Sequence, residues 1–223
     1  LDGDGLTLLV EADQPAWRPD DGALRVSNVQ TGTFSGPTGS TRGQHHHQPG
    51  LRVVTPQPTR ALWTPRAGMV EATMRAPADP TCMLALWLVG FEESSPLDSG
   101  EICVAELFGD AIGPTGSRVR LGIKAHHDPR LRTEVVDVAL DIDATQEHTY
   151  AARWDARRTV FLVDGAVVAT IDQGVDYPLQ LMVDLFEFPA TGERAAADYP
   201  KSALVTAVRG YEPGDTTGPR RGL

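Results

Sequence analysis

The sequence predicts an all-β protein, built as a sandwich or barrel of antiparallel sheets, and three observations support this prediction. Glycine (22 residues) and proline (17 residues) are spread through the 223-residue chain and divide it into short segments. The segments between them are rich in β-branched and apolar residues, and several alternate with a period of two, as half-buried strands do. No segment sustains the longer apolar period of an amphipathic helix.

The expected strands are short and follow one another closely along the chain. The apolar runs cover residues 5–12, 51–56, 68–77, 81–90, 101–109, 118–126, 159–172 and 179–189. Within the run at 159–172, Asp164-Gly165 lies between two apolar arms, which is a strong β-hairpin signal. Residues 33–50 show no strand pattern and are expected to form a long surface loop. We expect one domain over residues 1–223, with a loosely held polar tail at 212–223.

The composition bounds the partners and the chemistry. The formal net charge is −10, and an acidic surface repels phosphate groups, so neither nucleic acid nor an anionic membrane is expected as a partner. The two cysteines allow at most one disulfide and form no structural zinc pattern, so no metal site is expected. Cys82 shares the strand parity of Leu84 and Leu86 and not that of Trp87, so on a regular strand it should face away from the side of Trp87, and we expect two free thiols.

The segment "SGEICVAELFGD" (99–110) carries two glutamates within an apolar run. On a regular strand Glu101 and Cys103 share a face, while Glu106 has the opposite parity. A single β-bulge within residues 103–106 would return Glu106 to that face, and the two carboxylates would form a pair. In the alternative, Glu106 faces solvent on an unbulged strand and Glu101 caps its start. Spacing alone leaves both interpretations open.

Paired carboxylates have a chemical use. In retaining glycosidases one carboxylate attacks the anomeric carbon and the other protonates the leaving oxygen, at a separation of roughly 5–5.5 Å. The charge of Glu101 would favour a protonated Glu106, as an acid catalyst requires.

The surroundings of this segment resemble glycoside hydrolase family 16, the group of laminarinases, lichenases and agarases. "GEICVAELFG" is similar to the family's active-site strand, E-[IL]-D-[IV]-x-E, in which x is the bulged residue. Other similar blocks follow in the family's order over residues 51–213: "WTPRAGMVEATMRAP", "MLALWLVG", "EHTYAARWDARRTVFLVDGAVVATI", "LQLMVDLFEFP" and "ALVTAVRGYEP".

This resemblance implies a fold and an activity. The fold would be a jelly-roll β-sandwich of two antiparallel sheets with a concave substrate cleft. The activity would be retaining endo-hydrolysis of a β-linked polysaccharide of the β-glucan or galactan type, or transglycosylation by the same residues. No cofactor is required for this chemistry, and the resemblance implies a secreted protein. The alternative is a non-catalytic glycan-binding module on the same fold.

Residue by residue, the resemblance makes Glu101 the nucleophile and Glu106 the general acid/base. Trp87 matches a tryptophan that commonly forms part of the sugar-binding floor. Asp184 and Phe186 occupy positions where the family often has cleft-facing Asn and Trp, and their spacing places both on one face. For Trp87 and Phe186, ordinary core packing is the alternative.

A histidine commonly follows the active-site strand in the family, and His126 is the expected substrate contact here. By parity it shares a face with Lys124.

Two positions depart from the family pattern. The middle aspartate, which orients the nucleophile and whose charge supports the acid, is replaced by Cys103. A thiol has an ordinary pKa of about 8.5 and donates hydrogen bonds poorly, so the rate and pH optimum are in question. The calcium-linked aspartate of the family aligns with Thr206, which makes a structural calcium less expected than in typical members.

Overall fold

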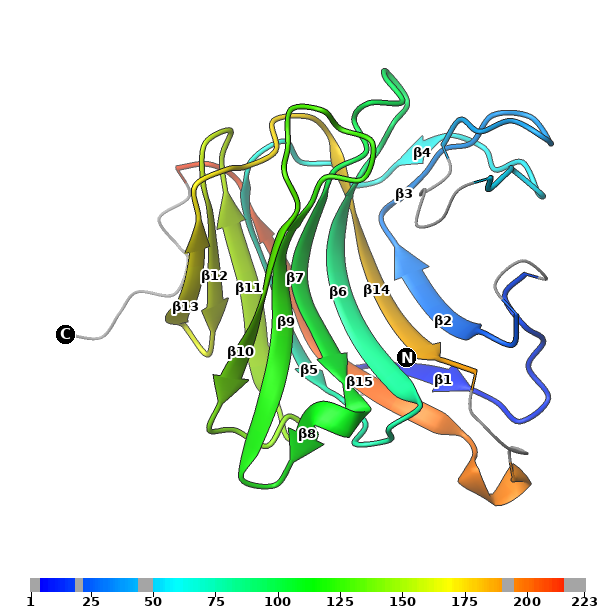
Figure 1. Cartoon of the computed structure of the whole chain (residues 1–223), viewed down its shortest axis with the longest axis vertical. Helices are drawn as coiled ribbons and strands as arrows, with labels where there is room; N and C mark the ends of the chain where they lie inside the picture. Colours follow the sequence, from blue (N-terminus) through cyan, green and yellow to red (C-terminus); the bar gives the residue numbers. More distant parts are fainter. Residues whose placement is uncertain (1–4, 19–21, 44–49, 190–194, 215–223) are drawn as a thin grey trace.

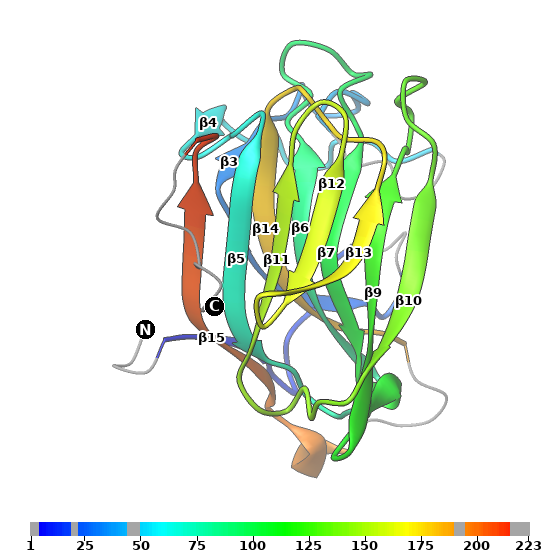
Figure 2. The same cartoon turned by 90° about the vertical axis from the view of Figure 1, so that its left-hand side faces the viewer.

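The computed structural model describes residues 5–18, 22–43, 50–189 and 195–214, and it consists mainly of two antiparallel sheets that face each other (Figures 1 and 2). The six-stranded sheet has the order β1 (Leu6–Val10), β15 (Lys201–Tyr211), β5 (Gly68–Arg75), β11 (His148–Trp154), β12 (Thr159–Val163) and β13 (Ala166–Ile171). The seven-stranded sheet has the order β10 (Glu134–Leu140), β9 (Gly116–Lys124), β7 (Glu101–Phe108), β6 (Cys82–Gly90), β14 (Leu179–Glu187) and β2 (Arg25–Gln30), with β8 (Ile112–Gly113) paired to β9. A small third sheet pairs β3 (Gly32–Thr33) with β4 (Arg60–Ala61).

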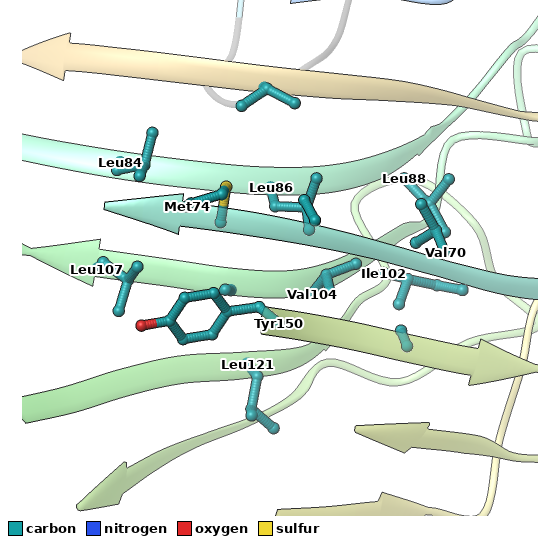
Figure 3. Packing of buried hydrophobic residues seen from close by; sticks show 14 of the residues in the cluster. Val70, Met74, Leu84, Leu86, Leu88, Ile102, Val104, Leu107, Leu121 and Tyr150 are labelled. Atoms are coloured by element: carbon teal, nitrogen blue, oxygen red, sulfur yellow. The ribbon is translucent and has the colours of Figure 1, made fainter. Parts of the chain in front are cut away.

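The hydrophobic core lies between the two large sheets (Figure 3). Every second residue of β6 enters it, as the alternation in the sequence predicts, and Leu84, Leu86 and Leu88 are fully buried. They pack in one cluster with Met74 of β5 and Tyr150 of β11, from the opposite sheet. Burying each such leucine side chain contributes roughly 1.5–3 kcal/mol to folding.

Most predicted strands are present, and the expected hairpin is confirmed. Asp164 and Gly165 join β12 to β13 with φ values of 49° and 76°, the left-handed pair that a tight hairpin turn requires. The prediction of a strand at 51–56 was wrong. Val53 is buried, but its backbone N–H donates to Ser40 O at 2.8 Å and so bonds to a loop instead of a sheet.

The predicted loop at 33–50 begins with the short strand β3, and its residues 34–43 form no strand, while 44–49 lie outside the described residues. Of the predicted tail at 212–223, only 212–214 are described. Within the described ranges, no helix has the length and hydrophobicity needed to span a membrane.

The seven-stranded sheet positions the candidate site. Its long strands bend, and the face turned away from the six-stranded sheet lies on the inside of the bend (Figure 1). We call this face the concave face. It receives the side chains that alternate with the core positions, among them Trp87, Glu101, Cys103, Glu106 and Asp184.

Candidate active site

Strand β7 contains the expected bulge, and the bulge brings both glutamates to the concave face. Against β6, Leu86 pairs with Ala105 whereas Trp87 pairs with Cys103, so Val104 is an extra residue on β7. The pairing of β7 with β9 shifts over the same interval. Val104 enters the core (Figure 3), and the strand regains its register with Glu106 on the face of Glu101.

The two carboxylates form a close, buried group with the thiol between them. One side-chain ligand atom from each of Glu101, Cys103 and Glu106 lies within 4.8 Å of the other two. Glu101 is 1% exposed and Glu106 is 4% exposed. Carboxylates at such burial require charged or hydrogen-bonding partners.

Lys124, at the end of β9, supplies the counter-charge. Its Nζ lies 2.5 Å from Glu106 Oε1 and 3.0 Å from Glu101 Oε1, and it sits 5.3 Å above the Trp87 ring. Burial alone would lower the pKa of Lys124, but the negative charge of Glu101, with Glu106 beside it, outweighs burial and raises the pKa above its ordinary value. The ammonium therefore stays charged and bridges the pair. Sequence reasoning noted the parity of Lys124 but did not identify this bridge.

His126 approaches the other side of Glu101. Its Nε2 lies 2.8 Å from Glu101 Oε2, within hydrogen-bond distance. His126 follows β9 in a turn that closes with a bond from Asp128 N–H to Ala125 O at 2.8 Å, and its φ of 45° is left-handed. The turn, not strand parity, directs the imidazole to Glu101. The structure thus brings His126 into the site, while its contact with substrate stays a prediction.

Cys103 occupies the family's aspartate position as a neutral group. Burial, reinforced by the charges of Glu106 and Glu101, raises the pKa of the Cys103 thiol well above its ordinary value. Its Sγ donates to the Arg120 backbone carbonyl at 3.6 Å. Both cysteines are free, as predicted, and Cys82 lies in the core.

Metal binding at this group would require chemistry that the residues oppose. A thiol must lose its proton to ligate a metal, which the raised pKa of Cys103 disfavours, and the Lys124 ammonium already bridges Glu101 and Glu106. At the position of the family's calcium-linked aspartate, Thr206 Oγ1 donates to Thr73 O at 3.4 Å. It offers a hydroxyl where calcium favours a carboxylate.

Asp184, on β14, is aligned with Glu106 across Ala85 of β6. Burial is the main cause that raises its pKa to about 7; Asn28 opposes the shift and the charge of Glu101 adds to it. Asn28 Nδ2 donates to Asp184 Oδ1, while Asp184 Oδ2 has no hydrogen-bond partner among the described residues. Asp184 is 1% exposed, so accepting a sugar hydroxyl would require a covering side chain to move.

Trp87 and Phe186 form a stacked pair, with ring centroids 5.4 Å apart and an interplanar angle of 30°. Both rings are half-buried and neither belongs to the core cluster, which argues against ordinary core packing. Phe186 lies on the same face as Asp184, as the spacing predicts. A partly accessible aromatic surface beside the carboxylates suits the C–H face of a sugar ring.

A buried network connects the start of β7 to the turn of His126. Gly100 N–H donates to Tyr177 Oη at 2.7 Å, and Tyr177 O–H donates to Asp128 Oδ2 at 2.8 Å. Arg130 Nε donates to Asp128 Oδ1 at 2.7 Å, and its guanidinium lies 4.8 Å from the Tyr177 ring. This network holds the backbone before Glu101 against the turn that carries His126. Sequence reasoning did not find it, since its members come from separate loops.

These features define an antiparallel β-sandwich that carries a bulge-aligned carboxylate pair on the concave face of one sheet. The family model described as "Glycosyl hydrolases family 16" matches residues 63–198, more than half of the chain. The chain therefore belongs to glycoside hydrolase family 16, as the resemblance implied.

Solved structures share this fold at low sequence identity. A GlcNAcα1-4Gal-releasing endo-β-galactosidase from Clostridium perfringens has a TM-score of 0.77 and 18% identity, over 96% of this chain and 53% of that chain. The laminarinase catalytic domain from Thermotoga petrophila has a TM-score of 0.53 and 20% identity, over 68% of this chain and 66% of that chain. The Bacillus licheniformis β-glucanase has a TM-score of 0.54 and 21% identity, over 68% of this chain and 69% of that chain.

At these identities the similarity shows the fold alone, and the chain spans about half the length of the endo-β-galactosidase structure. No curated protein matches the sequence.

Proposed function

We propose that this protein is a retaining endo-glycosidase that hydrolyses a β-linked polysaccharide of the galactan or β-glucan type. The observation that carries the proposal is the bulge at Val104, which brings the carboxylates of Glu101 and Glu106 to one face with oxygens within 4.8 Å. A separation of roughly 5–5.5 Å is typical of retaining enzymes, whereas inverting enzymes leave about 6.5–9.5 Å for a water molecule.

In the proposed mechanism, Glu101 attacks the anomeric carbon while Glu106 gives its proton to the leaving oxygen. The glycosidic bond breaks and a covalent glycosyl-enzyme forms on Glu101. Water then attacks the same carbon and gives its proton to Glu106, which restores both carboxyl groups and retains the configuration. The hydrogen bond from His126 fixes the orientation of the Glu101 carboxylate. None of these steps needs a cofactor.

Lys124 imposes a condition on this mechanism. Its ion pair is made with the carboxylate form of Glu106, whereas the first step requires a protonated Glu106. A sugar that enters between the two carboxylates would separate the ammonium from Glu106 and allow the acid to take up a proton. Substrate binding and acid protonation are therefore coupled through Lys124 in this proposal.

The comparison structures guide the order in which polysaccharides are tested. The endo-β-galactosidase superposes on 96% of this chain, whereas the laminarinase and the β-glucanase each superpose on 68%. This supports testing galactans first and β-glucans second. We expect the protein to act outside the cell, as the resemblance implied.

A non-catalytic glycan-binding module is the second candidate function, and two observations favour it. The neutral thiol of Cys103 replaces a charged aspartate, and Lys124 pairs with both glutamates. In such a module Lys124 would keep both glutamates ionised, and the concave face would bind sugar without cleaving it.

The test is product release from galactan, β-1,3-glucan, β-1,4-glucan and mixed-linkage glucan. The native protein is compared with Glu101→Gln and Glu106→Gln, and with Glu11→Gln as a control at an exposed position. We expect one polysaccharide to be cut by the native protein and by Glu11→Gln, with at least about a 100-fold loss in both site variants. NMR of the first-formed product should show the β-anomer.

Each alternative predicts a different result. Cutting with an inverted first product would exclude the retaining mechanism. Undiminished cutting by Glu101→Gln would exclude Glu101 as the nucleophile. Binding to a polysaccharide in an affinity gel without any cutting would establish the glycan-binding module.

A further inference from the structure

Two phenylalanines, Phe108 and Phe188, extend the candidate site beyond Phe186, which the sequence had identified. Phe108, Phe186 and Phe188 form a set of nearly parallel rings, which we call the aromatic platform. The Phe108 and Phe188 centroids are 6.3 Å apart at 13°, and the Phe186 and Phe188 centroids are 6.1 Å apart at 11°. All three rings are half-buried, so each keeps an accessible surface.

The aromatic platform lies on the Glu106 side of the carboxylate pair. Phe108 follows Glu106 by two residues on the regular part of β7, so it lies on the same face about 7 Å farther from Glu101. Met83 of β6 pairs with Phe108 on one side and with Phe186 on the other. The platform therefore crosses three adjacent strands, next to the row that contains Glu106.

A charged pair borders the platform. The Arg120 guanidinium carbon lies 5.1 Å from the Phe108 ring centroid, and Arg120 is paired with Glu106 in the β7–β9 register. Arg120 Nε donates to Asp137 Oδ1 at 2.9 Å, and the two side chains are 42% and 41% exposed. Apolar rings with accessible polar groups over Phe108 match a pyranose, which has apolar C–H faces and a rim of hydroxyls.

The proposed role of Glu106 indicates which sugar unit of the substrate the aromatic platform binds. Glu106 protonates the leaving oxygen, so the sugar attached to that oxygen lies on the Glu106 side of the cut bond. We propose that the aromatic platform binds the sugar unit on the leaving-group side, and that it also holds an acceptor sugar when one replaces water. This inference rests on the proposed function, because it uses the role of Glu106.

The test uses Phe108→Ala and Phe188→Ala, with Phe34→Ala as the matched control. Phe34 also lies under an arginine, with Arg42 5.4 Å from its centroid, but it packs on Phe91 near the Glu101 end of the sheet. Phe108→Leu keeps an apolar side chain without the ring and replaces the alanine variant if that variant does not fold.

Cleavage and transfer are measured on the polysaccharide that the panel identifies and on the matching glycosyl fluoride. The fluoride has no sugar on the leaving side. We expect the platform variants to lose about tenfold in kcat/KM on polysaccharide and in transfer to an added sugar acceptor, and to cleave the fluoride at the native rate. Phe34→Ala should leave the ratio of transfer to hydrolysis unchanged.

Binding is measured separately by affinity gel on the same four polysaccharides, with each platform change made in Glu101→Gln protein so that turnover does not interfere. Weaker binding in the platform variants supports the inference. Native-strength binding and transfer in both platform variants would overturn the inference and leave the proposed function intact. If the Glu101→Gln protein binds none of the four polysaccharides and the native protein cuts none, both proposals fail.

Discussion

Lys124 Nζ lies 2.5 Å from Glu106 Oε1 and 3.0 Å from Glu101 Oε1, so one ammonium contacts both carboxylates of the pair. The proposed general acid is therefore ion-paired before substrate arrives. Lys124 thus places a positive charge beside the two carboxylates. The family's aspartate, at the position of Cys103, would place a negative charge there.

Replacing Lys124 by methionine should move the alkaline limb of the pH–rate profile to higher pH. Without the ammonium, two carboxylates within 4.8 Å repel each other, and one of them holds a proton more firmly. We expect the limb to shift by at least about one pH unit. One unit corresponds to about 1.4 kcal/mol, and the interaction energy of the partly buried ammonium with the adjacent carboxylates exceeds that value. The measurement is kcat/KM against pH on the polysaccharide that is cut.

Lys124→Arg is the control, because it keeps the positive charge, and its profile should stay close to the native one. If the alkaline limb of the Lys124→Met profile does not move, or moves to lower pH, the ion pairs of Lys124 do not govern protonation of Glu101 and Glu106.

Asp184 should make the protein less stable as pH rises from about 4 to about 7. Its folded pKa of about 7 lies above the ordinary value of 3.8, so over this interval the folded state holds a proton that the unfolded state has released. Stability is full below the interval and falls by up to about 1.4 kcal/mol per pH unit within it. Asp184→Asn cannot titrate and keeps an acceptor for Asn28. Its stability relative to native protein should therefore increase between pH 5 and pH 8.

Urea unfolding of both proteins at the two pH values measures this difference. The same stability difference at pH 5 and pH 8 would show that Asp184 is already ionised in the fold.

Neither cysteine should react with a thiol reagent in the native protein. Cys82 is 1% exposed and Cys103 is 0% exposed. Burial raises the pKa of Cys82 to about 11, and that of Cys103 also lies well above its ordinary value, so little reactive thiolate exists at neutral pH. Ellman's reagent should detect no thiol in the native protein and both after unfolding. One rapid equivalent in native protein, lost in Cys103→Ser, would show that the centre of the site opens to solvent.

Two tyrosine variants should differ in their effect on stability. Tyr177→Phe leaves the buried Gly100 N–H and one oxygen of Asp128 without their tyrosine partner, which costs about 1–3 kcal/mol of unfolding free energy. Tyr150 Oη is also buried, but it has no hydrogen-bond partner within the described part of the chain, so Tyr150→Phe should be neutral or stabilising. Denaturant unfolding compares the two variants. Equal losses would show that the Tyr177 network adds nothing beyond packing.

The sequence predicted much of the fold because burial of one sheet face leaves a period of two along each strand. The apolar runs missed β2 and β10, which are the two edges of the seven-stranded sheet. Edge strands bury less surface and carry more polar residues, so their apolar alternation is weak. The apolar runs also missed β11 and β15, which lie inside the six-stranded sheet and which only the blocks that resemble the family covered. The sequence wrongly predicted a strand at 51–56, where buried side chains stabilise a loop that bonds to Ser40.

The sequence by itself determined which residues form the centre of the candidate site. Parity placed Cys82 on the face of the leucines that follow it, because the direction of a side chain from a strand is a local property of the chain. Parity left two interpretations of Glu106 open, and the resemblance to the family favoured the bulge between Cys103 and Glu106.

Only the tertiary structure decided the electrostatics of that site. Lys124 reaches Glu106 through the register of β7 with β9, His126 reaches Glu101 from a left-handed turn, and Tyr177 connects two loops. Charge interactions depend on the distance and burial of side chains that are far apart in sequence, and these quantities exist only once the sheet has formed.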